Sequence, residues 1–202
     1  MLDRTLQHWL RAPLQALARV LVRWRVRADP LTWTGFALGM LAALCIAVQW
    51  PLTGLGLLLL SRLCDGLDGA VARATQATDR GAFLDIALDF LFYAAIPLAF
   101  AVADPAANAL PAAVLLASFI GTGSSFLAFA VLAQKRGLSS LSFPDKGFYF
   151  LGGLTEATET LAAFVLMCLW PTAFPVIAYV FAALCAITVA MRIAWGVQRL
   201  AD

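Results

Sequence analysis

The chain has 202 residues, of which 62% are hydrophobic and 13% are charged, and its formal net charge is +2. This composition excludes an ordinary soluble domain, because a soluble chain of this length would expose too much apolar surface. It also argues against nucleic-acid binding, since the basic residues are spread over several loops and form no single groove. We therefore expect an all-α integral membrane protein.

Residues 1–29 are predicted to form an amphipathic juxtamembrane helix. Apolar residues recur there at helical spacing, and basic or polar residues occupy the rest of the helical wheel. The apolar positions are Leu6, Trp9, Leu10, Leu14, Leu17, Val20, Leu21 and Trp24. Such a pattern is typical of an interfacial helix on the inner leaflet of a membrane, and an ordinary packing helix is the alternative.

Six apolar segments follow, each long enough to cross a hydrocarbon core of about 30 Å as a helix. They are Leu31–Trp50, Leu52–Arg73, Gly81–Ala103, Ala109–Ala133, Gly147–Trp170 and Thr172–Gly196. Residues 30–202 are thus predicted to form one six-transmembrane helix bundle. The turns after the first, third and fifth segments lack Lys and Arg, whereas the opposite side is basic. The positive-inside rule therefore places both termini and the loop 74–80 in the cytoplasm.

Four aspartates interrupt these apolar segments. Asp65 and Asp68 lie near the end of the second segment. Asp85 and Asp89 lie near the start of the third. Residues three and four apart share a helix face, so each pair lines one face, and antiparallel helices can bring the two pairs together.

The aspartates need neutralising, because each ionised carboxylate near the bilayer centre costs about 2.5–3.5 kcal/mol. Carboxylate oxygens without histidine or cysteine select Mg²⁺, Mn²⁺ or Ca²⁺. Two divalent cations would match the four charges, and paired metals are a recurring device of phosphoryl transfer. In a purely structural alternative, Arg62 and Arg73 pair with the two aspartates of the second segment to fix helix packing. That alternative leaves the aspartates of the third segment without partners.

The surroundings of the aspartates suit a phosphate ligand. Gly69, Ala72 and Gly81 keep the helix surfaces low where a bulky phosphate would approach. Arg73 supplies a forked cation that matches phosphate oxygens.

This segment resembles the signature of the CDP-alcohol phosphotransferase (CDP-alcohol phosphatidyltransferase) family, D-x2-D-G-x2-A-R-x8-G-x3-D-x3-D. The matching residues are Asp65, Asp68, Gly69, Ala72, Arg73, Gly81, Asp85 and Asp89. Seven residues, not eight, separate Arg73 from Gly81, which affects the path of the loop and not the metal site. The family also tends to carry a P-N-x-x-T element, of which Pro30 and Thr34 are present while Leu31 replaces the asparagine.

The resemblance implies transfer of a substituted phosphate from a CDP-linked donor to an alcohol, with release of CMP, in phospholipid biosynthesis. CDP-diacylglycerol is the favoured donor, and glycerol phosphate, inositol phosphate, serine or a second lipid remain possible acceptors. Two divalent cations, Mg²⁺ or Mn²⁺, are implied, held by the four aspartates. Asp89 would also take the proton from the acceptor hydroxyl. The implied nucleotide contacts are Pro30, Thr34, Asp65, Gly69, Ala72, Arg73, Thr78 and Gly81. The inner (plasma) membrane of a bacterium is the expected location.

Two further polar groups are candidate acceptor sites. Glu156 and Glu159 lie inside the fifth apolar segment, where they either bind the acceptor or pair with Arg62 or Arg192 to hold the bundle together. The loop after the fourth segment carries three basic residues that either meet anionic substrates or anchor the chain at the membrane surface. They are Lys135, Arg136 and Lys146.

Small residues at positions 121–125 allow close helix approach in the fourth segment, which favours packing and, beyond it, a homodimer.

Two other functions compete with the transferase. An intramembrane prenyltransferase also uses Mg²⁺ and aspartate-rich helices, but its motifs are spaced differently and it usually has more spans. A divalent-cation transporter would need polar groups along a path to the far side, whereas here the aspartates cluster at one end.

Overall fold

The computed structural model describes residues 2–136 and 153–200, and within these ranges all regular structure is helical. The helices are α1 (Leu2–Arg23), α2 (Ala28–Ala47), α3 (Pro51–Ala74), α4 (Asp79–Ala103), α5 (Pro105–Lys135), α6 (Ala157–Leu169) and α7 (Phe174–Leu200), with a 3₁₀ turn η1 (Pro171–Ala173) before α7. Among the described residues, four segments are long and apolar enough to cross a membrane. They are Ala28–Ala47, Asp79–Ala103, Pro105–Lys135 and Pro171–Leu200.

Prolines and side-chain caps set the starts of these helices. Pro51 opens α3 and Pro105 opens α5, where their missing N–H groups need no partner. The Asp104 carboxylate accepts a hydrogen bond of 3.2 Å from the backbone N–H of Ala107 at the start of α5. The Thr78 hydroxyl accepts a hydrogen bond from the backbone N–H of Gly81 at the start of α4. The short connections before Pro51 and Pro105 confirm the turns predicted after the first and third apolar segments.

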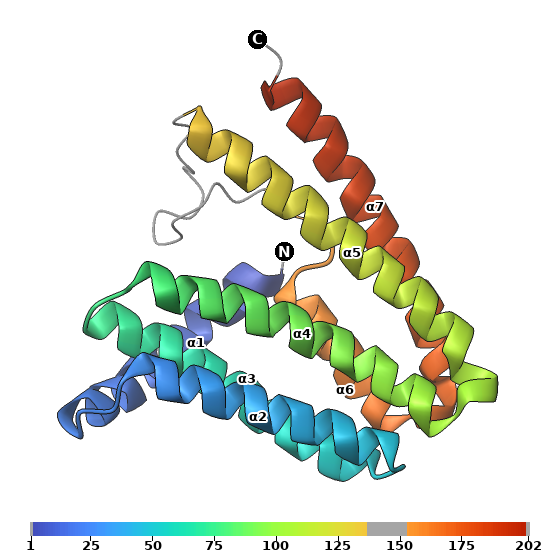
Figure 1. The fold of residues 1–202 in the computed structure, drawn as a ribbon, viewed down its shortest axis with the longest axis horizontal. Coiled ribbons are helices and arrows are strands. Elements are labelled where there is room, and N and C mark those ends of the chain that lie inside the picture. The colour runs from blue at the N-terminus through green and yellow to red at the C-terminus, as the bar shows by residue number, and fades with distance from the viewer. Residues whose placement is uncertain (1, 137–152, 201–202) are drawn as a thin grey trace.

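The helices form two groups around a shared core. Figure 1 shows α2, α3 and α4 running together on one side of the molecule, with α5 and α7 crossing on the other. Helix α2 packs against both α3 and α4, α4 packs against α5, and α5 packs against α7. Buried phenylalanines join the groups, since the rings of Phe100 on α4 and Phe174 at the start of α7 stack with centroids 4.6 Å apart.

Glycines on α2 permit the close approach that places the aspartate-bearing helices. A Cβ atom at Gly35 would lie 3.1 Å from the Cβ atom of Cys64 on α3. A Cβ atom at Gly39 would lie only 2.6 Å from Cδ2 of Phe92 on α4. The Ser61 hydroxyl of α3 donates to the Gly35 carbonyl at 2.7 Å, which further ties α3 to α2. Helix α2 is therefore the element that holds α3 and α4 in position.

The small residues of the fourth apolar segment pack within the chain. A Cβ atom at Gly121 would lie 3.2 Å from Cγ2 of Val189 on α7. A Cβ atom at Gly123 would collide with the ring of Phe90 on α4. The packing role predicted for these glycines is confirmed, and their contacts lie inside one chain.

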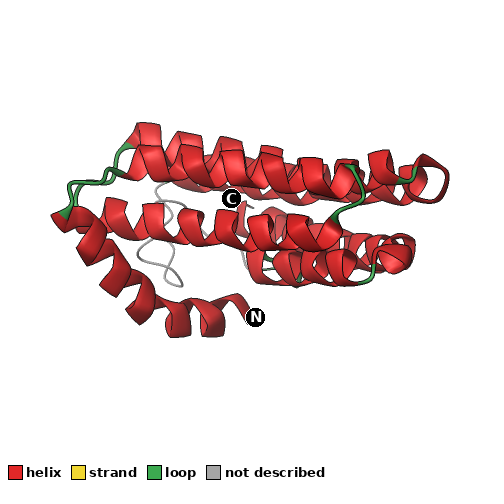
Figure 2. Ribbon diagram, turned by 90° about the horizontal axis from the view of Figure 1, so that it is seen from below, coloured by secondary structure: helices red, strands yellow, loops and turns green. Residues whose placement is uncertain are grey.

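Helix α1 packs on α3 and also presents apolar side chains outwards. A small cluster joins the two helices, with Ala18, Ala70 and Val71 buried and Leu14, Leu21, Val22, Ala28 and Leu31 around them. Leu17, Val20 and Trp24 are exposed. Figure 2 shows α1, the helix beside the label N, running obliquely to the more parallel helices of the bundle.

The fifth apolar segment differs from the prediction. Its residues 147–152 lie outside the described residues, and residues 153–156 are not helical, so α6 begins only at Ala157. The backbone N–H of Glu156 donates to Oε2 of Glu159 at 3.1 Å, and Oε1 of Glu156 accepts from the N–H of Gly153 at 3.1 Å. These carboxylates satisfy backbone donors at a helix start, which explains why the helix begins there. The two glutamates thus lie at the start of a 13-residue helix and not in the middle of a span.

Candidate active site

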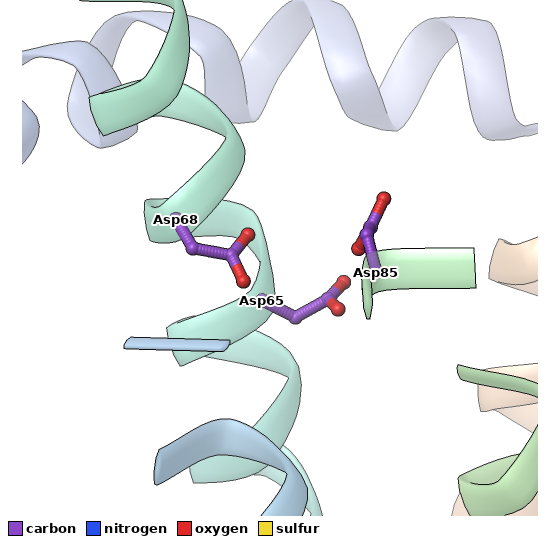
Figure 3. A group of neighbouring side chains, drawn as sticks. All are labelled: Asp65, Asp68 and Asp85. Atoms are coloured by element: carbon purple, nitrogen blue, oxygen red, sulfur yellow. The ribbon is translucent and has the colours of Figure 1, made fainter. Parts of the chain in front are cut away.

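Three of the four aspartates converge. One carboxylate oxygen from each of Asp65, Asp68 and Asp85 lies within 4.8 Å of the other two. Figure 3 shows Asp65 and Asp68 on α3 and Asp85 on α4, with Asp65 between the other two. The prediction that α3 and α4 bring aspartates of both pairs together is confirmed for these three residues.

The three-aspartate group fits a divalent cation. Asp68 is 5% exposed, and its Oδ2 atom has no hydrogen-bond partner within the described residues. A buried carboxylate oxygen without a partner is costly, and a bound cation would satisfy it. All three donors are hard carboxylate oxygens, the ligand type that Mg²⁺, Mn²⁺ and Ca²⁺ prefer. Asp85 is exposed, so the group is open on one flank.

Asp89 is held by an arginine. The Nη1 atom of Arg62 donates to Oδ1 of Asp89 at 2.6 Å and lies 3.6 Å from Oδ1 of Asp65. The Arg62 guanidinium also lies over the Phe92 ring, 3.9 Å from its centroid. The alternative in which arginines pair with aspartates only to fix helix packing left Asp89 without a partner. That expectation was wrong, because Arg62 pairs with Asp89. The same pair shows that an arginine of α3 reaches an aspartate of α4.

A small cavity joins these charged side chains to the start of α2. Its lining residues are Thr32, Gly35, Phe36, Arg62, Asp65, Asp85, Leu88 and Asp89. Pro30 and Thr34 are the α2 residues predicted for the site, whereas the α2 residues of this lining are Thr32, Gly35 and Phe36. Two of these lining residues, Thr32 and Gly35, are small residues at helical spacing, and that pattern was the available signal.

Residues proposed for the nucleotide surround the connection between α3 and α4. A Cβ atom at Gly69 would lie 3.1 Å from Nη1 of Arg73, so the arginine side chain folds back over the bare glycine. Ala72 is partly exposed on the same helix. The Thr78 hydroxyl accepts a hydrogen bond of 3.1 Å from the N–H of Gly81 and caps α4. In the sequence, Gly69, Ala72 and Arg73 follow Asp68 directly on α3, and Thr78 and Gly81 precede Asp85 at the start of α4.

The α2 candidates lie inside a helix. Pro30 belongs to the first turn of α2, and the Thr34 hydroxyl donates to the Pro30 carbonyl at 2.7 Å. Arg80, at the start of α4, lies 3.5 Å from the Asp29 carboxylate and links the starts of the two helices. Pro30 and Thr34 thus lie within the first two turns of α2, which begins at Ala28.

A second polar cluster lies where α5, α7 and the start of α6 meet. Arg192 is 7% exposed, and its Nη1 atom donates to the Thr122 carbonyl at 2.9 Å. The Thr188 hydroxyl accepts from the Thr155 N–H at 3.1 Å. A Cβ atom at Gly153 would collide with the side chain of Thr188, which shows how closely this segment crosses α7. The cluster anchors the chain ahead of α6 to the long helices.

The basic acceptor candidates fall at the end of α5. Lys135 is its last residue, Arg136 follows directly, and both are exposed. Lys146 lies outside the described residues. Among the described residues the carboxylate partners of Arg62 are Asp65 and Asp89, so the predicted pairing of Glu156 or Glu159 with Arg62 is not what the structure shows. Arg192, the other predicted partner, interacts electrostatically with Glu156.

Comparison with known proteins gives relatives over nearly the whole chain. A family model described as CDP-alcohol phosphatidyltransferase matches residues 25–196. The chain is 51% identical over 193 residues to the inner membrane protein YnjF of Escherichia coli (strain K12), which covers 96% of this chain and 94% of that protein. It is 31% identical over 160 residues to an uncharacterized protein of Aquifex aeolicus (strain VF5), with 79% and 76% of the two chains covered.

Solved structures share the fold. The phosphatidylinositol phosphate synthase PgsA1 of Mycobacterium tuberculosis, in a crystal structure with CDP-DAG bound, gives a TM-score of 0.72 at 22% identity over 91% of this chain and 93% of that chain. The same synthase in complex with manganese and citrate gives 0.70 at 21% identity over 91% and 88%. At this level of identity the likeness shows a common architecture.

Proposed function

Because the chain belongs to the CDP-alcohol phosphatidyltransferase family and is a transferase, we propose that it moves a phosphatidyl group from CDP-diacylglycerol to an alcohol and releases CMP. The observation that carries this proposal is the convergence of Asp65, Asp68 and Asp85 beside the cavity, within the segment that resembles the family signature. The similar PgsA1 fold, which holds CDP-DAG in one crystal structure, supports the choice of donor.

We propose that two divalent cations, Mg²⁺ or Mn²⁺, bind to Asp65, Asp68, Asp85 and Asp89. The unpartnered Oδ2 atom of Asp68 and the manganese in the related PgsA1 structure support a divalent metal. When bound, such ions neutralise phosphate oxygens and orient the groups that react.

In the proposed reaction, the acceptor oxygen forms a bond to the phosphorus that bears the lipid. The bond from that phosphorus to the bridging oxygen breaks, and CMP leaves with both electrons of that bond. Asp89 accepts the proton of the acceptor hydroxyl, the task of a general base. Arg62 holds Oδ1 of Asp89, which leaves Oδ2 to take the proton.

The remaining residues of the chain bind and orient the substrates. Arg73 can meet the donor phosphates with its fork, and the bare surface at Gly69 leaves room for the nucleotide. The full set proposed for the nucleotide is Pro30, Thr34, Asp65, Gly69, Ala72, Arg73, Thr78 and Gly81. For the acceptor we propose charged residues at the end of α5, at the start of α6 and in the connection between them. They are Lys135, Arg136, Lys146, Glu156 and Glu159.

We place the enzyme in the inner membrane of a bacterium, with six crossings and with both termini and the aspartates on the cytoplasmic side. The basic loops and the name of the Escherichia coli relative support this placement. The exposed apolar residues Leu17, Val20 and Trp24 support an interfacial position for α1. A homodimer is part of the proposal, and light scattering of the protein in neutral detergent measures it.

The deciding experiment is release of CMP from CDP-diacylglycerol by the purified protein with Mn²⁺, screened over acceptor alcohols. We expect release that depends on one acceptor and stops with EDTA. The variant Asp68→Asn should lose activity, whereas Asp104→Asn, which keeps a capping side chain at the far end of α4, should retain it. Consumption of a prenyl pyrophosphate without CMP release, or metal transport into vesicles, would favour one of the two competing functions.

A further inference from the structure

Arg62 brings a fixed positive charge into the aspartate group. Its Nη1 atom lies 2.6 Å from Oδ1 of Asp89 and 3.6 Å from Oδ1 of Asp65. Asp65 is also a member of the three-aspartate group, so this residue is shared between Arg62 and any cation that the group binds.

The guanidinium is held from several sides. Phe92 supports its face, with 3.9 Å from the guanidinium carbon to the ring centroid. The Nη2 atom donates to the Ser61 hydroxyl at 3.2 Å, and that hydroxyl donates in turn to the Gly35 carbonyl. Only 12% of the Arg62 side chain is exposed. A side chain restrained by an ion pair, a ring and a hydroxyl cannot move away from the aspartates at little cost.

Charge balance shows what this cation does. The four aspartates and Arg62 together carry a formal charge of −3. Two divalent cations would bring the site to +1, which suits an incoming pyrophosphate. Without Arg62, the same two ions would leave the site neutral. The arginine therefore favours the anionic donor and opposes the second cation.

We infer that Arg62 is a positioning residue that holds Asp89 and competes with the second divalent cation for Asp89 and Asp65, so that the two ions bind with unequal affinities. The first ion binds to the three-aspartate group of Asp65, Asp68 and Asp85, whose oxygens already lie close together. The second ion has to share Asp89 with the guanidinium. This inference rests on the proposed function only in taking two metal ions as the occupants.

The test is a titration of the purified protein with Mn²⁺ alone in a neutral detergent, with free Mn²⁺ measured by electron paramagnetic resonance. Wild-type protein should bind two ions in separate steps. In Arg62→Gln the second step should tighten by roughly tenfold or more, because a nearby positive charge has been removed, while the first step changes less. Arg62→Lys should remain close to wild type, because it keeps the charge.

Two controls separate this effect from a general change in charge. Arg80→Gln removes a cation that pairs with Asp29 outside the cavity, and it should leave both steps unchanged. Adding Asp89→Asn to Arg62→Gln should abolish the gain, because it removes the contested carboxylate that does not belong to the three-aspartate group.

Several results would overturn the inference. These are a wild-type protein with two equal sites, a folded Arg62→Gln whose titration superimposes on wild type, and a second ion that binds more weakly in that variant. If Arg62→Gln does not fold, two equal sites in the wild-type protein still overturn the inference, and Arg62→Lys still tests whether the charge at this position is what matters. The titration contains neither donor nor acceptor. If the wild-type protein binds Mn²⁺ in two steps but releases no CMP in the activity assay, that result counts against the proposed function alone. Unchanged binding in Arg62→Gln with normal CMP release counts against the role of Arg62 alone.

Discussion

Replacing Gly39 with alanine places a methyl group against a ring that has no room to move. The new Cβ atom would lie 2.6 Å from Cδ2 of Phe92 and 3.0 Å from Oγ of Ser61. Phe92 is 0% exposed and packs edge-to-face on Phe164, so either its ring or α2 has to shift. Overpacking of this kind costs about 1–3 kcal/mol.

Alanine recovers part of that cost, because it is favoured over glycine in a helix by about 0.5–1 kcal/mol. We therefore expect Gly39→Ala to lower the free energy of unfolding by about 0.5–2 kcal/mol. Reversible unfolding by SDS in mixed micelles, followed by circular dichroism, measures this change.

The matched control is Gly56→Ala on α3. A Cβ atom at Gly56 has no neighbour within 4 Å among the described residues, so only the helical preference remains and stability should rise or stay unchanged. If Gly39→Ala is as stable as Gly56→Ala, the close contact between α2 and Phe92 is refuted.

Three further predictions address the site and its orientation. Asp68→Asn should weaken Mn²⁺ binding and CMP release together, because it removes a carboxylate whose Oδ2 atom has no hydrogen-bond partner among the described residues. Normal Mn²⁺ affinity in the folded variant would contradict the role of Asp68 as a ligand. Asp89→Asn should reduce turnover by about 10²–10⁴-fold, the usual range for general-base assistance, and should change donor affinity less. An unchanged rate at saturating donor would show that Asp89 is not the general base. Single cysteines at Gln76 and Ala106, in a background without the native cysteines, should react with an impermeant reagent from opposite sides of the membrane. Labelling of both from one side would overturn the orientation.

The features that the sequence predicts well are local. Asp65 and Asp68 are three residues apart and Asp85 and Asp89 are four apart, so the shared helix face follows from helical geometry alone. The turns at Pro51 and Pro105 follow from proline chemistry in the same way. These local rules predict that each helix carries its aspartates on one face. Bringing three of them to one place also requires α2, which packs against both α3 and α4.

The features that were missed depend on packing between distant segments or on competition between signals. Arg62 and Asp89 are 27 positions apart, and their contact requires α2 to set the relation of α3 to α4. Hydropathy alone extended the fifth apolar segment through Glu156, although Glu156 and Glu159 have the three-residue spacing of a helix start. In that segment the capping pattern was the better guide.

Phe92 connects the packing of α2 with the charge arrangement of the site, because the ring that fills the space at Gly39 is also the ring beneath Arg62. Positions 39, 62 and 92 should therefore change together during evolution. A relative with a larger residue at position 39 should carry a smaller one at position 92, and a relative without the aromatic ring should have lost the arginine more often than chance allows. The geometry thus predicts a covarying triplet on three different helices, all of whose members lie outside the aspartate signature.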